Sequence, residues 1–179
     1  MSSPPIDDLI PDLSAGREAA FVALYDALAG PLHRTAWTLT GSAAEAEDLV
    51  QETMVALVRA RTSLTGVRNL RAYLFATLRH AAAARAERRA TERRALARVP
   101  ARETGPEPPR SAQAAIDSDR LARAVAALPS EQREVLALKL DGGLTFAEVG
   151  STLGISPNTA ASRYQYALNQ LRELLPEGE

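Results

Sequence analysis

The feature that most constrains this fold is a pair of closely spaced helix starts near the C-terminal end of the chain. Thr145 and Glu148 fit a capping box, in which the hydroxyl and the carboxylate each satisfy a free backbone N–H at a helix start. Gly154 supplies the left-handed residue that commonly ends a helix. Ser156 is a good N-cap, and Pro157 fits the first helical position because its missing N–H costs nothing there. The sequence therefore predicts two short helices joined by a tight turn.

The second of these helices is predicted to have one buried and one open face. Apolar residues recur at helical spacing and form the buried stripe: Ala160, Tyr164, Ala167, Leu168 and Leu171. The N-terminal half leaves a second set near solvent: Asn158, Ala161, Ser162, Arg163 and Gln165. In helix-turn-helix proteins this part of the second helix meets base edges of DNA. A plain helical hairpin stays open as the alternative, since the face is only weakly basic.

Composition favours a helical protein without membrane segments or thiol chemistry. The hydrophobic fraction is 46% and rich in alanine, and no apolar run approaches the roughly 18 residues that a membrane span requires. The N-terminus is acidic and contains proline, unlike a secretory signal, so we expect a cytoplasmic location and no membrane insertion. Without cysteine there is no thiolate zinc site, and His33 and His80 form no metal-ligand cluster. We therefore expect no metal and no cofactor.

The formal net charge of −1 hides a strong asymmetry along the chain. Residues 1–58 carry nine acids against two bases. Residues 59–110 reverse this, with thirteen arginines against four glutamates. A block of that charge attracts polyanions such as DNA.

A proline-rich stretch divides the chain. Four of the eleven prolines fall between residues 100 and 109. We predict a flexible linker over 99–119 between two small helical domains at 1–98 and 120–179, the second ending in the helix-turn-helix. A flexible segment of about 20 residues spans roughly 25 Å, so the domains are expected to move independently. No strand pattern is present, and the predicted fold class is all-α.

Within the first domain, helix boundaries follow from local signals. Gly30 and Pro31 are expected to separate two short helices. Ser42 and Glu45 form a second capping box that begins a third helix with a broad apolar face and exposed acids. Asn69 is expected to begin the next helix, which leads into a run of arginines.

Two separated blocks resemble the sigma factors of bacterial RNA polymerase, in the extracytoplasmic-function (ECF) group of the sigma-70 class. Residues 21–41 followed by AEAEDLVQET (44–53) are similar to sigma region 2, and ALPSEQREVLALKLDGGLTFAEVGSTLGIS (127–156) is similar to region 4. The order and spacing of the blocks also match. The resemblance implies an initiation factor that binds core polymerase, selects promoters and helps separate the strands, while the polymerase supplies catalysis.

The resemblance also implies three sets of site residues. The helix with DLVQE is expected to dock on the clamp helices of the largest polymerase subunit through Asp48, Gln51, Glu52, Met54 and Val55. The downstream (−10) promoter element is expected to contact Tyr73, Arg79, His80, Arg85, Arg88 and Arg89. The upstream (−35) element is expected to contact Arg163 and Gln165 principally, with Asn158, Ser162 and Arg172.

On the two expected DNA-binding surfaces, the chain departs from the family pattern at four positions. Tyr73 stands where members usually carry tryptophan, His80 where they carry asparagine, and Ala84 where they carry an acid. Ala161 stands where lysine is frequent. Attraction between arginines and phosphates is therefore the clearest downstream contribution, and the upstream helix is expected to bind DNA weakly by itself. Tyr73 and Phe75 lie at helical spacing with leucines, which favours core packing over base stacking.

Other functions remain open at this level. No phosphate-binding loop, catalytic carboxylate pair or nucleophile motif is present, so an enzyme is not expected. A stand-alone helix-turn-helix regulator would not need the 48–52 block. A sigma-derived protein-interaction module would explain the atypical residues. The family resemblance further suggests an anti-sigma factor or other regulatory protein as a partner.

Overall fold

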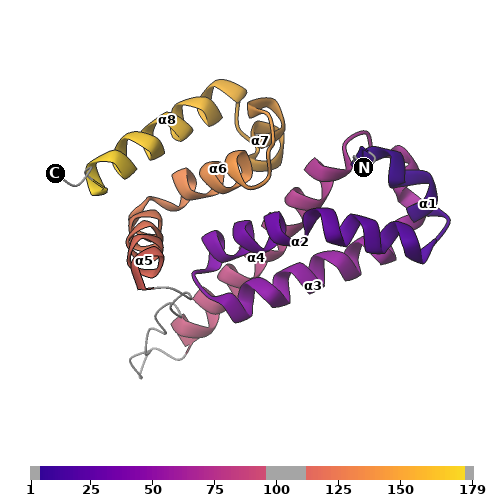
Figure 1. Cartoon of the computed structure of the whole chain (residues 1–179), viewed down its shortest axis with the longest axis horizontal. Helices are drawn as coiled ribbons and strands as arrows, with labels where there is room; N and C mark the ends of the chain where they lie inside the picture. The colour runs from indigo at the N-terminus through magenta and orange to yellow at the C-terminus, as the bar shows by residue number, and fades with distance from the viewer. Residues whose placement is uncertain (1–4, 96–111, 176–179) are drawn as a thin grey trace.

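A computed structural model describes residues 5–95 and 112–175, with side chains from 119 onward in the second range, and these residues form helices without strands (Figure 1). The first unit contains the 3-10 turns η1 (Ile6–Leu9) and η2 (Arg61–Gly66) and the helices α1 (Ile10–Ser14), α2 (Glu18–Thr40), α3 (Ala43–Arg59) and α4 (Leu70–Ala95). The second contains α5 (Ala112–Ala127), α6 (Ser130–Leu140), α7 (Phe146–Leu153) and α8 (Pro157–Leu174). The predicted all-α class and the terminal helix-turn-helix are confirmed.

Helix α2 corrects the expectation of two short helices divided at Gly30 and Pro31. It runs without interruption from Glu18 to Thr40, with Pro31 inside. Proline removes one hydrogen bond and clashes with the preceding turn, which costs about 3 kcal/mol in a helix interior. Leu28 and Leu32 on either side of the proline are fully buried, and their packing offsets that cost. Tertiary burial thus overrides the local break signal.

Helix α3 begins at its predicted cap, but the capping box is only half formed. Ser42 Oγ accepts the N–H of Glu45 at 3.4 Å. The reciprocal bond is absent because the Ser42 N–H donates to Thr40 Oγ1 at 3.3 Å, while the Glu45 carboxylate pairs with Arg89 of α4 at 2.5 Å. Glu45 is therefore used between helices and not within its own turn.

Helix α4 receives two side-chain caps at its N-terminus. Asn69 Oδ1 accepts the N–H of Ala72 at 2.8 Å, as expected from the sequence. Asp7 Oδ1 accepts the N–H of Leu70 at 2.7 Å. The segment that carries Asp7 was not predicted to be ordered structure, yet it places Leu13 in the core and fixes the start of α4.

The helix-turn-helix forms as its caps predict. Thr145 and Glu148 make the full capping box, with the Thr145 N–H donating to Glu148 Oε2 at 2.7 Å. Gly154 ends α7 in the left-handed region at φ 67°. Ser156 Oγ accepts the N–H of Thr159 at 3.0 Å and begins α8. Both helix starts identified in the sequence are confirmed.

The two units pack against each other, which differs from the expectation of independent motion (Figure 1). Helix α2 contacts α6, and α4 contacts α7. One apolar cluster includes Leu32 of the first unit together with Val135 and Leu138 of the second. Residues 112–119, expected in the linker, are the first turns of α5, whose alanine-rich sequence favours helix. Residues 99–111 of the predicted linker lie outside the described residues.

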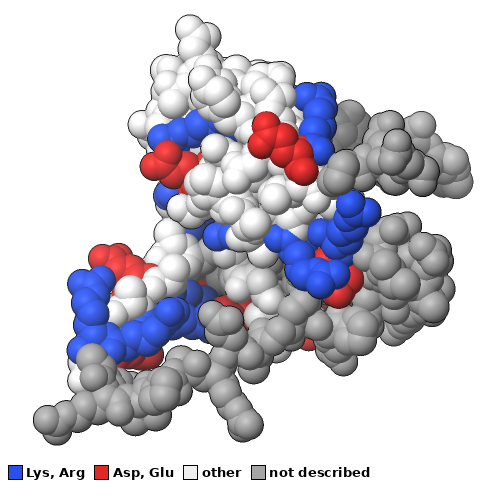
Figure 2. Space-filling view, turned by 90° about the vertical axis from the view of Figure 1, so that its left-hand side faces the viewer, with Lys and Arg blue, Asp and Glu red and all other residues white. Residues whose placement is uncertain are grey.

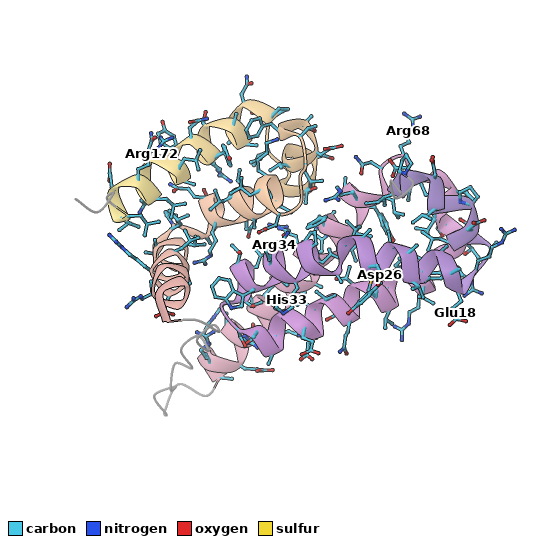
Figure 3. All side chains as sticks on the ribbon, in the orientation of Figure 1. Glu18, Asp26, His33, Arg34, Arg68 and Arg172 are labelled. Carbon is cyan, nitrogen blue, oxygen red and sulfur yellow. The ribbon has the colours of Figure 1, made fainter. Side chains whose placement is uncertain are left out.

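Polar contacts line the edges of this interdomain seam. Three side chains of the first unit donate to acceptors between α6 and the start of α7: Arg34 Nε to Asp141 Oδ1 (2.8 Å), Arg71 Nη1 to the Gly142 carbonyl (3.0 Å), and Asn69 Nδ2 to Glu148 Oε1. Figure 3 shows Arg34 between α2 and the second unit. Asn69 thus caps α4 with its oxygen and contacts the cap of α7 with its nitrogen.

We predict that Ala160→Asp unfolds the second unit. Ala160 is fully buried between α7 and α8, so aspartate there would bury an unpaired charge, at a cost of about 3 kcal/mol or more. Urea denaturation followed by circular dichroism measures the loss. Ser162→Asp, two residues away on the exposed side of α8, is the control and should change stability by less than about 0.5 kcal/mol. A melt of Ala160→Asp equal to wild type would contradict this helix phase.

Candidate polymerase- and DNA-binding surfaces

Helix α3 presents one buried and one open face. Its inner face includes Leu49 and Leu57, both fully buried. The predicted polymerase-binding residues lie mainly on the other face: Asp48, Gln51, Glu52 and Val55 are exposed, and Met54 is half-buried against the core. Val55 keeps 47% of its surface exposed. An apolar side chain with carboxylates beside it is compatible with the apolar centre and polar rim of a protein interface.

A groove between α2 and α3 adjoins this face. Its volume is about 510 Å³, and its lining includes Tyr25 from α2 with Glu47 and Gln51 from α3. Tyr25 is 49% exposed. Neither Tyr25 nor Glu47 is among the site residues predicted from the sequence. Tyr25 lies within an apolar helical pattern in the sequence, and its place in this groove follows from the packing of α2 beside α3.

Arginines of α4 pair with the acids of α3. Arg85 donates from Nε and Nη2 to Glu52 Oε2 at 3.0 and 2.7 Å, and its Nη1 lies 3.8 Å from Asp48 Oδ2. Arg89 pairs with Glu45 at 2.5 Å. The structure thus brings together residues that the sequence assigned to different partners, polymerase and DNA.

The remaining predicted residues of α4 lie in different surroundings. Arg79 is turned to the second unit, where Nη2 lies 3.2 Å from Glu134 Oε2 of α6. Arg88 is exposed, and its Nε donates to the Ala84 carbonyl of its own helix. His80 is exposed. Tyr73 is half-buried against the main apolar cluster, which agrees with packing as its principal role.

Helix α8 leaves an open face along its N-terminal half. Asn158, Ser162 and Gln165 are exposed there. Arg163 is held by Glu131 of α6, with Nη2 2.8 Å from Oε2 and 28% of its side chain exposed. Arg172 lies in the last turn of α8, is exposed and donates to Asn169 Oδ1 of the same helix; Figure 3 labels it on the C-terminal half of α8. Arg163 therefore has to break its ion pair with Glu131 before it can contact DNA.

Charges of both signs lie next to each other on the surface. On the face shown in Figure 2, blue arginine and lysine side chains stand beside red acids in small groups, with uncharged surface between them. The arginine-rich block of the sequence is thus partly neutralised from elsewhere in the fold. Within the described ranges no group of three histidine, aspartate or glutamate side chains is arranged to hold a metal ion, and no helix there is long and apolar enough to cross a membrane.

Comparison with known proteins assigns both units. Residues 24–92 match the family model for sigma-70 region 2, and residues 118–171 match that for sigma-70 region 4. The chain is 37% identical over 168 residues to the ECF RNA polymerase sigma factor SigL of Mycobacterium tuberculosis, covering 92% of this chain and 94% of the relative. The chain belongs to the ECF group of sigma factors. The resemblance predicted from the two sequence blocks is confirmed.

Further relatives agree with this assignment. The sigma factor is 36% identical over 136 residues to ShbA, an ECF sigma factor of Streptomyces griseus, covering 72% of this chain and 70% of the relative. Its fold is similar to that of the sigma factor RpoE in complex with the anti-sigma factor NepR from Bartonella quintana, with TM-score 0.70, 24% identity, and coverage of 96% and 94%. It is similar to CnrH in complex with the cytosolic domain of CnrY at the same TM-score and identity, with coverage of 94% and 96%.

For this sigma factor we predict that Glu131→Gln strengthens DNA binding by the free protein. The substitution releases Arg163 and removes a carboxylate, so affinity for duplex DNA should rise roughly two- to fivefold and the salt dependence should steepen by about one unit. Fluorescence anisotropy at several salt concentrations measures both quantities. Glu173→Gln, which removes the same charge from an exposed position of α8, is the control. Equal affinities of the two variants would show that Arg163 does not contact DNA.

Proposed function

We propose that this sigma factor acts through three separate surfaces, one for polymerase and two for promoter DNA. The exposed face of α3 docks on core polymerase, the outer side of α4 contacts the downstream element, and the N-terminal half of α8 reads the upstream element. The single observation that supports this division is the exposure of acids with Val55 on α3, apart from the polar face of α8. No catalytic role is assigned to the chain, since the polymerase performs the chemistry.

The polymerase surface is favoured by its mixed character. Asp48 and Glu52 supply acceptors for charge-assisted hydrogen bonds, and Val55 supplies apolar area that docking would remove from water. A stand-alone DNA-binding regulator has no use for such a surface. We place the protein in the cytoplasm, where its polymerase partner acts.

The DNA surfaces are favoured by position more than by charge. Arg88 and His80 are exposed on α4, and Asn158, Ser162 and Gln165 are exposed on α8. Polar side chains at the start of a second helix suit base edges in the major groove. The ion pairs of Arg79 and Arg163 weaken contact with DNA by the free chain. We therefore propose that promoter binding depends on the complex with polymerase.

An anti-sigma factor is the proposed regulatory partner. A groove of about 490 Å³ lies between α2 and the helices of the second unit, and its lining includes Trp37, Leu121 and Leu140. Leu121 and Leu140 are 49% and 59% exposed. Apolar side chains that line a groove from both units suit an amphipathic helix that holds them together. One structural relative, RpoE, was solved in complex with the anti-sigma factor NepR, and another, CnrH, in complex with the cytosolic domain of CnrY.

Reconstitution with core polymerase tests the function directly. The purified protein is added to bacterial core RNA polymerase, and promoter fragments are selected with the complex. Binding with recovery of a shared promoter sequence is the expected result. Binding without promoter selection would instead indicate a sigma-derived interaction module, and no binding, with DNA retained by the free protein, would indicate a stand-alone regulator.

We predict that Asp48→Arg combined with Glu52→Arg weakens binding to core polymerase at least tenfold without unfolding the first unit. Charge reversal removes two acceptors and sets like charges against Arg85, while both positions stay at the surface. Pull-down with core polymerase and circular dichroism measure binding and folding. Glu18→Arg with Asp26→Arg, on the exposed side of α2, makes the same charge change elsewhere (Figure 3). Equal retention of both double variants by polymerase would refute the α3 surface.

A further inference from the structure

The arginines of α4 differ in what their side chains contact. Arg85 directs three nitrogens toward acids of α3, and only 25% of its side chain is exposed. Arg89, one helical turn further on, pairs with Glu45. Arg88 lies between them in sequence but is exposed and contacts only a carbonyl of its own helix among the described residues. The side of α4 that carries Arg85 and Arg89 therefore faces α3.

The acids of α3 need these partners to stay together. Glu45, Asp48 and Glu52 follow one another at intervals of three and four residues, so their carboxylates share one side of the helix. Like charges at this spacing repel each other and would drive the side chains apart. Arg85 lies between two of these carboxylates and reduces that repulsion. The three acids are thus held in one arrangement on α3.

The pairing leaves acceptors available to a partner. Arg85 uses only one oxygen of Glu52, Oε2, for both of its hydrogen bonds. Glu52 and Asp48 keep 44% and 67% of their side chains exposed. A carboxylate whose rotamer is already held loses less conformational freedom when a partner binds it, so a preorganised surface binds more tightly than a mobile one.

We propose that Arg85, assisted by Arg89, is a positioning residue of the polymerase-binding surface and not a DNA contact. It holds Glu52 and Asp48 in the orientation that the polymerase binds. This inference rests on the proposed function of α3, and it reassigns two arginines from the downstream-element set. In the free protein, the exposed arginines of α4, among them Arg88, then remain open to DNA.

The test compares the affinity of full-length variants for reconstituted core polymerase. Arg85→Gln is expected to weaken binding roughly two- to fivefold, because the acids lose their fixed arrangement. Arg85→Lys, which keeps the charge but not the paired N–H donors, is expected to restore part of the loss. Glu52→Gln should weaken binding in the wild-type background and weaken it less when Arg85 is already Gln, since the two residues act as one unit.

Matched variants separate this role from charge and from DNA binding. Arg68→Gln removes the same charge from an exposed position before α4, where Figure 3 shows the side chain pointing away from both units, and should leave polymerase affinity unchanged. Arg88→Gln should lower affinity for duplex DNA and reduce the salt slope by about one unit, and Arg85→Gln should do so much less. Thermal denaturation of each variant shows that the fold is retained.

The possible failures can be distinguished. If Glu52→Gln weakens polymerase binding but Arg85→Gln behaves like Arg68→Gln, the positioning role is wrong while the proposed surface stands. If Glu52→Gln has no effect, the α3 surface itself is wrong, and the positioning role is overturned with it. If Arg85→Gln lowers DNA affinity as much as Arg88→Gln and leaves polymerase affinity unchanged, Arg85 is a DNA contact.

Discussion

Burial of α6 on two sides is the constraint on which the rest of the structure depends. Val135 and Leu138 belong to the apolar cluster that continues into the first unit, while Leu136 packs with Leu128 and Ala167 beneath α8. A surface helix needs only one apolar stripe, whereas a helix covered on two sides needs apolar residues on both of them. The successive apolar residues of α6 therefore hold the helix-turn-helix together and also attach it to α2.

Local chemistry was sufficient to predict where four of the eight described α-helices begin. The caps at Ser42, Asn69, Thr145 and Ser156 are short-range interactions, so each is visible within four residues of sequence. Pro31 misled the prediction because the burial of Leu28 and Leu32 depends on helices distant in sequence. The N-terminal turns were not predicted for the same reason, since they are fixed by a contact with the start of α4, which is distant in sequence.

The exposed surfaces of the candidate sites could be predicted from the sequence, but the ion pairs that their residues form could not. Periodicity correctly indicated the open faces of α3 and α8. It contains no information on partners 33 residues apart, such as Arg85 and Glu52, or 55 residues apart, such as Arg79 and Glu134. The run of arginines was therefore predicted to bind DNA as one block. In the fold, some of these arginines pair with acids of α3, one pairs with an acid of α6, and others are exposed to solvent. Net charge along a sequence is a poor guide to charge available at a surface.

The two glutamates of α6 hold two of the proposed DNA-contacting arginines close together. Glu131 holds Arg163 and Glu134 holds Arg79, so the proposed upstream and downstream contacts meet carboxylates that lie one helical turn apart on α6. Promoter elements centred about 25 base pairs apart are separated by about 85 Å along the duplex. Arg79 and Arg163 cannot span that distance while both are paired with α6. Under the proposed function, simultaneous contact with both elements therefore requires the two units to separate, with loss of the pair between Arg79 and Glu134.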